Sequence, residues 1–158
     1  MKGVEMAALT FNESLVKIME EPLTREQAEG ALADVLHEAG YVKDSYRQAI
    51  LDRETNFPTG LFAGEVNVAI PHCDVENVNE GAMCVGVLRH PAAWGRMEDR
   101  TQTCEVSLVV MLALTDPKDH LETLRKVIGL VQDQELAARV VAVETPGEVF
   151  SLVADKLA

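Results

Sequence analysis

Apolar residues return along this chain at two different spacings, which predict an alternation of helices and strands. A spacing of three or four positions indicates amphipathic helices, and nearly continuous apolar runs bounded by turn residues indicate buried strands. The predicted helices cover residues 11–21, 24–40, 44–55, 116–131, 133–142 and 145–157. The predicted strands cover residues 66–70, 82–88 and 105–114. The last run is apolar at almost every position, as in a central strand covered on both faces. We therefore expect one α/β domain that takes in residues 1–158.

Residues that begin and end helices sharpen this pattern. Two sequences have the form of a capping box, in which Ser or Thr precedes Glu or Gln by three positions: Thr24–Gln27 and Thr145–Glu148. Asp116–Pro117 is typical of a cap followed by the first helical residue. Turn-forming residues gather at 56–60 and 90–95, so we expect a loop at each of these places.

Composition narrows the classes of partner. The 158 residues include 26 acidic and 14 basic side chains, which give a formal net charge of −12 and a sequence pI near 4.7. This charge argues against binding to nucleic acids or to an anionic membrane surface. No segment has the length and hydropathy of a signal peptide or a membrane span. Cys73, Cys84 and Cys104 match neither a disulfide framework nor zinc-ligand pairs, so we expect reduced thiols and a cytoplasmic protein.

The strand predicted at residues 66–70 ends at a proline that is followed by a histidine. Pro71 removes a backbone donor and disfavours helical backbone at Ile70, so the strand stops there and His72 follows at the edge of the sheet. A histidine in this place most often only caps a strand beside solvent. A second group at the same edge would favour a function instead.

The predicted strand directions place a second group, His120, at the same edge of the sheet. If strands 66–70, 82–88 and 105–114 run up, down and up, the first and third end at the same edge, and His120 follows the third in the first turn of a helix. We then expect His72 and His120 to face one cavity. Free N–H groups and the helix dipole at that place favour an anion such as phosphate. Taken alone, His120 is more typical of an exposed residue at a helix start, and only its pairing with His72 favours a function.

Three chemistries remain for this pair of histidines. A catalytic zinc site usually has three protein ligands, so two histidines fit it poorly. A hydrolase with a cysteine nucleophile would use Cys73 with His72 as its base. Adjacent side chains of an extended chain point in opposite directions, so proton transfer between these two residues is geometrically poor. A neutral imidazole that attacks phosphorus is the third option, and Arg53 is the candidate for binding phosphate oxygens. The ordinary alternative for Arg53 is a surface pair with Asp52 or Glu54.

Four segments together resemble a known family: Arg53-Glu54, Pro58–Leu61, Val68–His72 and Asp119–Leu121. They are similar to the enzyme IIA domain of the fructose-mannitol class (type 2) of the bacterial phosphoenolpyruvate:sugar phosphotransferase system. The resemblance covers nearly the whole chain. It implies an α/β fold, in which a mixed β-sheet is sandwiched between helices, and a phosphotransferase without a cofactor or a metal.

The resemblance also implies roles for individual residues. His72 would accept a phosphoryl group from the phosphocarrier protein HPr, on the outer nitrogen Nε2, and pass it to a cysteine of enzyme IIB. Arg53 would stabilise the phosphate, and His120 would be the second histidine of the site. The sugar would not touch this domain, and the membrane enzyme IIC would be an indirect partner on another chain. Cys73 and Asp74 are interpreted as a packed thiol and a turn residue.

The interval between Arg53 and His72 points to one branch of this family. It is longer than in the fructose and mannitol members, and the acidic residue that mannitol-type members carry six positions before the histidine is replaced by Val66, with Glu65 one place off. The chain looks most like the galactitol-specific branch, so the substrate of the pathway would be a hexitol such as galactitol. The alternative is a regulatory protein like the nitrogen-type enzyme IIA, in which the phosphorylation state controls partner binding.

Overall fold

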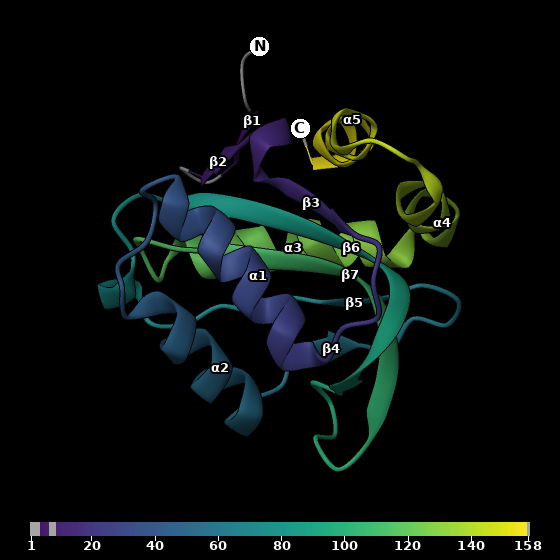
Figure 1. Cartoon of the computed structure of the whole chain (residues 1–158), viewed down its shortest axis with the longest axis horizontal. Coiled ribbons are helices and arrows are strands. Elements are labelled where there is room, and N and C mark those ends of the chain that lie inside the picture. Colours follow the sequence, from purple (N-terminus) through teal and green to yellow (C-terminus); the bar gives the residue numbers. More distant parts are fainter. Residues whose placement is uncertain (1–3, 7–8, 158) are drawn as a thin grey trace.

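The structure, a computed structural model, describes residues 4–6 and 9–157, and the side chains of residues 9–118 and 121–157. Its centre is a curled mixed sheet of seven strands, in the order β1-β2-β6-β7-β5-β4, with β3 also paired to β6 (Figure 1). The strands are β1 (Val4–Met6), β2 (Leu9–Phe11), β3 (Val16–Met19), β4 (Gly60–Leu61), β5 (Asn67–Ala69), β6 (Ala82–Gly95) and β7 (Thr103–Ala113). The helices are α1 (Arg25–Glu38), α2 (Tyr46–Asn56), α3 (Asp119–Gln132), α4 (Gln134–Ala142) and α5 (Pro146–Leu157), with 3₁₀ turns η1 (Glu13–Leu15) and η2 (Val75–Asn77).

Strand directions confirm the predicted topology. β6 and β7 form a long antiparallel pair, and β5 lies parallel to β7 on its other side. The ends of β5 and β7 therefore lie at the same edge of the sheet, where the Leu112 amide donates a hydrogen bond of 2.9 Å to the Pro71 carbonyl. This edge is where the chain leaves the sheet toward His72.

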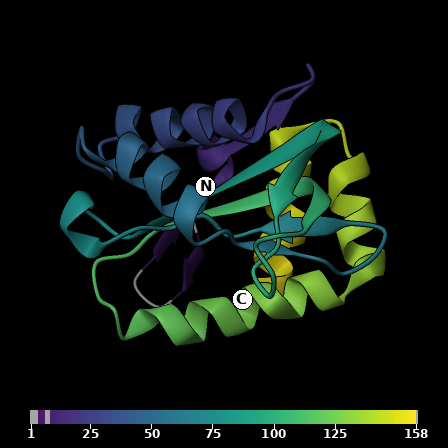
Figure 2. The same ribbon diagram turned by 90° about the horizontal axis from the view of Figure 1, so that it is seen from below.

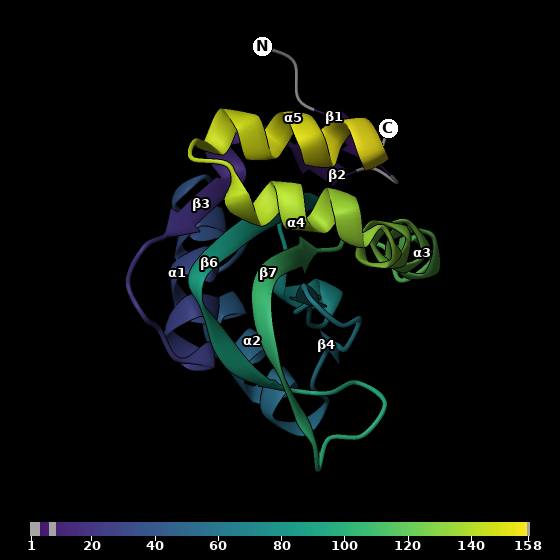
Figure 3. The ribbon, with the colours of Figure 1, turned by 90° about the vertical axis from the view of Figure 1, so that its right-hand side faces the viewer.

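Helices cover both faces of the sheet, so the predicted sandwich is confirmed. Figure 2 shows the blue α1 and α2 on one side of the sheet and the green α3 on the other, and Figure 3 shows α4 and α5 beside each other. Gly86 of β6 allows α1 to approach closely, because a Cβ atom there would lie 2.7 Å from a methyl carbon of Leu32. The buried hydroxyl of Tyr46 donates to the Leu112 carbonyl at 2.7 Å and fixes α2 against β7. No helix in the described part of the chain is long and apolar enough to cross a membrane.

Two predicted boundaries follow from capping boxes. The Thr24 hydroxyl accepts from the Gln27 amide and the Gln27 side chain accepts from the Thr24 amide, so α1 begins as predicted. At α5 the Thr145 hydroxyl accepts from the Glu148 amide and donates to the Glu148 carboxylate, so the same two residues meet at the helix start with a different second bond. The largest fully buried side chains around these helices and the sheet are Trp94, Tyr46, Leu15, Leu32, Leu36, Ile50, Ile70, Met83, Leu108, Met111, Leu112 and Leu130.

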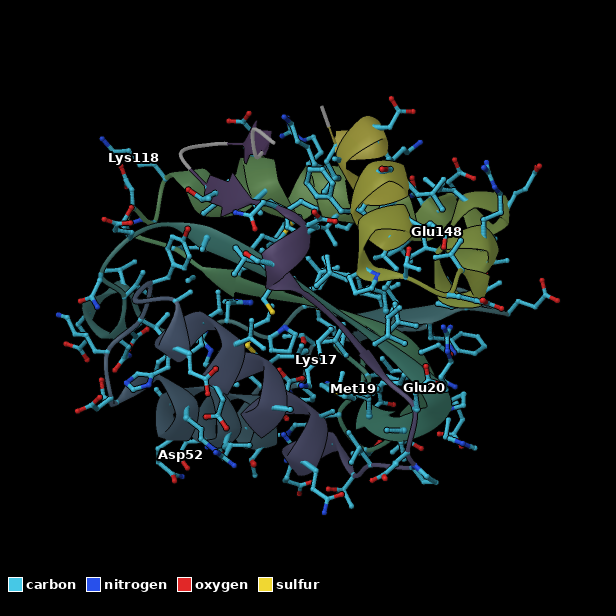
Figure 4. The ribbon with its side chains drawn as sticks, turned by 45° about the horizontal axis from the view of Figure 1, so that its top comes forward. Lys17, Met19, Glu20, Asp52, Lys118 and Glu148 are labelled. Carbon is cyan, nitrogen blue, oxygen red and sulfur yellow. The ribbon has the colours of Figure 1, made fainter. Side chains whose placement is uncertain are left out.

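The helix predicted at residues 11–21 is wrong. The segment forms the end of β2, the turn η1 and the strand β3, and β3 runs parallel to β6 with Val16 opposite Val85. Figure 4 labels Lys17 and Met19 of this strand and Glu20, the residue directly after it. The free edge of β6 gives the segment a partner, and the β-branched Val16 and Ile18 suit an extended backbone, so strand pairing overrides the helical spacing.

The loop predicted at residues 90–95 is also wrong, because β6 continues through it to Gly95. The pairing with β7 shifts register between Val87 and Ala92, and exposed Pro91 lies in this irregular part, where its missing N–H breaks no ladder bond. Trp94 then returns to the core, opposite Cys104.

The helix predicted from Asp116 begins later than expected, at Asp119. The Asp116 carboxylate accepts from the Lys118 amide at 2.9 Å and holds a turn before the helix rather than its first residue. The helical spacing of Leu121, Leu124, Val127, Ile128 and Val131 predicts a buried stripe on this helix, but Leu121 and Ile128 are 74% and 40% exposed.

Candidate functional site

His72 follows the end of β5 after Ile70 and Pro71, and its side chain is buried, with 7% exposed. Its Nδ1 atom lies 2.8 Å from the Ile70 carbonyl oxygen. A carbonyl only accepts, so Nδ1 carries the proton and donates, and in the neutral ring Nε2 then holds the lone pair. This contact at the end of the predicted strand thus favours the tautomer in which the outer nitrogen, Nε2, can act as a nucleophile.

Two cavities meet at this imidazole. One has a volume of about 580 Å³ and is bounded by the end of α2 and by the turn between β6 and β7, which Figure 2 shows from below. The other, of about 370 Å³, is bounded by the segment of His72 to Glu76 and by Leu114 and Pro117. His72 and Arg53 line both cavities. A small anion bound at His72 would therefore be within reach of Arg53.

Arg53 comes from the last turn of α2 and is 39% exposed. Its Nη1 atom lies 3.6 Å from a carboxylate oxygen of Asp74, and its guanidinium lies 5.3 Å from the centre of the Phe57 ring. Asp52 accepts instead from Gln48, and Glu54 points into the core. The ordinary alternative for Arg53, a pair with one of its two sequence neighbours, is therefore wrong.

Glu54 anchors a buried hydrogen-bond network beside the site. Its carboxylate accepts from the indole N–H of Trp94 at 2.8 Å and from the backbone N–H and hydroxyl of Thr59. Burial raises the pKa of Glu54, although these three donors act in the opposite direction. The Thr59 hydroxyl also accepts from the Ile70 amide at 3.0 Å, so the network reaches the strand that carries His72.

His120 lies in the first turn of α3, as the sequence predicted, but its side chain lies outside the described residues. The structure brings the end of β7 and the approach to α3 to His72, since Leu114 and Pro117 line the same cavity. The expectation that both histidines face one cavity stays a prediction.

Three residues of this site were missed by sequence reasoning: Met97, Glu98 and Arg100, which lie in the turn between β6 and β7 and line the larger cavity. Arg100 donates from Nη1 to the Asn56 carbonyl at 3.0 Å and so joins this turn to the end of α2. It adds a second guanidinium to the cavity that Arg53 and His72 line. Arg100 falls between the strands predicted at residues 82–88 and 105–114, and no pattern in the sequence indicates that it lies near His72.

Two further polar groups, Cys73 and Asp74, follow His72 directly in the chain. Cys73 is buried, and burial raises the pKa of its thiol to about 12, so it stays protonated and fits the predicted packed thiol. Asp74 is exposed and pairs with Arg53. Among the described side chains, no group of three or more His, Cys, Asp or Glu is arranged to hold a metal ion.

Comparisons with known proteins agree on one family. The profile described as "Phosphoenolpyruvate-dependent sugar phosphotransferase system, EIIA 2" matches residues 9–156. The galactitol-specific EIIA component of the phosphotransferase system of Escherichia coli (strain K12) is 30% identical over 97 residues, which cover 61% of this chain and 64% of that relative. The chain thus matches less than two thirds of that relative's length.

Longer matches come from mannitol proteins. The mannitol-specific phosphotransferase enzyme IIA component of Halalkalibacterium halodurans is 27% identical over 153 residues, which cover 95% of this chain and 98% of that protein. A solved complex of enzyme IIAMTL and phosphorylated enzyme IIBMTL from Escherichia coli contains a chain with a TM-score of 0.76 and 23% identity, over 93% of this chain and 99% of that one. At that identity the likeness supports the fold alone.

Proposed function

Because the chain belongs to the EIIA 2 family of the phosphoenolpyruvate-dependent sugar phosphotransferase system, we propose that it is a phosphoryl carrier and that His72 holds the phosphoryl group. The observation that supports this assignment is the bond from Nδ1 of His72 to the Ile70 carbonyl, beside two cavities that Arg53 also lines. A histidine nucleophile needs an unprotonated nitrogen near a group that binds phosphate, and this arrangement supplies both.

The transfer has two steps. The Nε2 lone pair of His72 attacks the phosphorus of a phosphohistidine on HPr, and the new P–N bond forms as the old one breaks. A cysteine thiolate of enzyme IIB then attacks the same phosphorus, a P–S bond forms, and Nε2 takes back its electron pair. The ring gains positive charge while it carries the phosphoryl group, because Nδ1 keeps its proton. The Ile70 carbonyl, 2.8 Å away, stabilises that charge.

Arg53 is proposed to bind the oxygens of the phosphoryl group while it moves. A guanidinium can donate two parallel hydrogen bonds to a phosphate, and Arg53 lines both cavities at His72. His120 is proposed as the second active-site histidine, through its place in the first turn of α3, where the backbone favours an anion.

The proposed partners are HPr as donor and a galactitol-type enzyme IIB as acceptor. The galactitol branch is supported by the 30% identity to the Escherichia coli component and by the long interval between Arg53 and His72. In this proposal the sugar is phosphorylated elsewhere, and enzyme IIC takes part only through enzyme IIB. The three free cysteines fit a reducing compartment, so we propose the cytoplasm as the place of transfer.

Labelling tests the assignment of His72. Incubation with phosphoenolpyruvate, enzyme I and HPr should place one acid-labile, base-stable phosphoryl group on the chain. The variant His72→Ala should stay unlabelled, and His90→Ala, which changes an exposed histidine, should label as the unmodified protein does. Full labelling of His72→Ala would refute the assignment.

Discharge distinguishes a relay from a regulator. The phosphorylated protein is mixed with a galactitol-type or a mannitol-type enzyme IIB, and loss of the label is followed over time. We expect faster loss with the galactitol-type partner. Faster loss with the mannitol type would overturn the choice of branch. A label that no enzyme IIB removes would favour the regulatory alternative over the relay.

A further inference from the structure

The segments Arg53-Glu54 and Pro58–Leu61 contain two polar residues, Glu54 and Thr59, that take no part in the proposed transfer. Both are buried, with exposed fractions of 2% and 4%, and neither touches the phosphoryl group in the proposed chemistry. Burial of a carboxylate and a hydroxyl costs free energy unless both are hydrogen-bonded. The partners of Glu54 and Thr59 therefore indicate what the two residues do.

Hydrogen bonds connect Glu54 to His72 in a fixed order. The Thr59 hydroxyl donates to the Glu54 carboxylate, with 3.0 Å between the oxygens, and accepts from the Ile70 amide at 3.0 Å. The Ile70 carbonyl in turn accepts the Nδ1 proton of His72 at 2.8 Å. A carboxylate only accepts, so Glu54 orients the hydroxyl of Thr59 and leaves its lone pairs for the amide of Ile70.

Ile70 needs this support because the strand ends there. β5 pairs with its neighbours only through Ala69, and Pro71 has no N–H with which to continue the ladder. The amide and the carbonyl of Ile70 belong to different peptide groups, so the connection acts through the position of the backbone and not through a relay of charge. Without Thr59, the amide of Ile70 would be buried and unpaired, and the backbone that carries its carbonyl would lose this anchor while the Pro71 carbonyl stays bonded to the Leu112 amide.

From this order of contacts we infer that Glu54 and Thr59 are positioning residues that set the tautomer of His72. They hold the Ile70 carbonyl where it keeps the proton on Nδ1, and the attacking lone pair therefore stays on Nε2. Glu54 also follows Arg53 directly on α2, so the same anchor holds the backbone from which the Arg53 side chain extends. The inference rests on the proposed role of His72 as the phosphoryl acceptor.

Thr59→Val tests the inference, because it keeps the shape of the side chain and removes the hydroxyl. Histidine labelled with ¹⁵N reports by NMR which ring nitrogen carries the proton. We expect the Nδ1–H tautomer in the unmodified protein and a shift toward Nε2–H in Thr59→Val. The rate of phosphorylation by HPr should fall about tenfold, the factor that corresponds to one hydrogen bond of ~1.4 kcal/mol. Thr59→Ser should restore both the tautomer and the rate.

Thr123 offers a matched control. It is a buried threonine on α3 whose hydroxyl has no hydrogen-bond partner in the part of the chain that the structure describes. Thr123→Val should change neither the tautomer of His72 nor the rate. An unchanged tautomer in folded Thr59→Val, with or without a slower rate, would overturn the inference. Absence of labelling on His72 in the unmodified protein would instead refute the proposed function.

The unmodified protein provides a measurement that does not depend on any variant being folded. Trp94 is the only tryptophan, it is fully buried, and its indole N–H donates to Glu54. Phosphorylation makes the ring of His72 more positive and strengthens its bond to the Ile70 carbonyl, so the network that includes Trp94 should adjust. We expect the emission of Trp94 to change in step with labelling. Stoichiometric labelling with no change in emission would contradict the connection.

Discussion

Glu29 makes the stability of this protein depend on pH in a direction that the structure fixes. It lies on the buried face of α1, where Oε1 accepts from Arg25 and Oε2 has no hydrogen-bond partner among the described residues. Burial raises the pKa of Glu29 to about 8, the negative charge of Glu54 adds to the effect, and the guanidinium of Arg25 opposes it. The folded protein therefore keeps a proton on Glu29 at a pH where the unfolded chain has lost it.

The magnitude follows from the two pKa values. Below an ordinary pKa of 4.5 both states hold the proton, and Glu29 has no effect on the pH dependence. Between 4.5 and about 8 only the folded state holds it, so the free energy of unfolding falls as the pH rises through this window. At ~1.36 kcal/mol for each pH unit, the full loss is on the order of 4–5 kcal/mol, reached above the upper value. This is a large part of the stability of an ordinary domain.

Urea unfolding at about pH 5 and about pH 9 measures this loss. Glu29→Gln imitates the protonated side chain at every pH, so its free energy of unfolding should fall less than that of the unmodified protein by on the order of 4 kcal/mol. Glu26→Gln is the matched control, because Glu26 lies on the same helix, near the same Arg25, and is 62% exposed. The reasoning is refuted if Glu29→Gln and the unmodified protein lose the same free energy between the two pH values.

Four further substitutions test the site and the fold. Arg53→Ala should slow phosphorylation by HPr by roughly 10²-fold, the scale for the loss of one charge-stabilising donor, and an unchanged rate would remove Arg53 from the site. Arg100→Ala should raise the KM for HPr more than it lowers kcat, because Arg100 is exposed at the rim of the cavity, and steady-state kinetics that show only a kcat effect would contradict this. Gly60→Ala would place a Cβ atom 2.5 Å from the Gly95 carbonyl oxygen, and we expect the free energy of unfolding in urea to fall by about 1–3 kcal/mol. An unchanged free energy of unfolding would show that the backbone moves to make room. Thr24→Ala should cost about 1 kcal/mol through loss of the α1 cap, and an unshifted urea midpoint would count against the capping box.

Local chemistry made part of the fold predictable from the sequence. Capping boxes placed the starts of α1 and α5, and the run before Pro71 placed the end of β5, because each of these signals acts within a few residues. The shared edge of β5 and β7 was also predictable, since alternating strand directions leave few arrangements. His72 was found for the same reason: its position depends on the strand stop that precedes it.

Contacts between distant segments decided what the sequence could not predict. Residues 16–19 have apolar spacing that suits a helix, but the free edge of β6 draws them into a parallel strand. Arg100 is adjacent to the site only because β6 continues through Pro91 and the turn that follows it returns toward α2. A register shift between two strands leaves no local pattern in the sequence. Neither the length of β6 nor the position of Arg100 near His72 could therefore be predicted.

The strongly acidic composition does not oppose the proposed transfer, because the charge at the site differs from the charge of the chain. The net charge is −12, yet two guanidinium groups, those of Arg53 and Arg100, line the cavity beside His72. Arg53 already has an anionic partner in Asp74, but that contact is 3.6 Å long and Asp74 is 74% exposed. Exposed pairs of this kind contribute on the order of 0–1 kcal/mol, so a phosphoryl group with nearly two negative charges can take the place of the carboxylate at little cost. In the proposed transfer we therefore expect Asp74 to hold Arg53 beside His72 between phosphorylations and to release it to the incoming phosphoryl group.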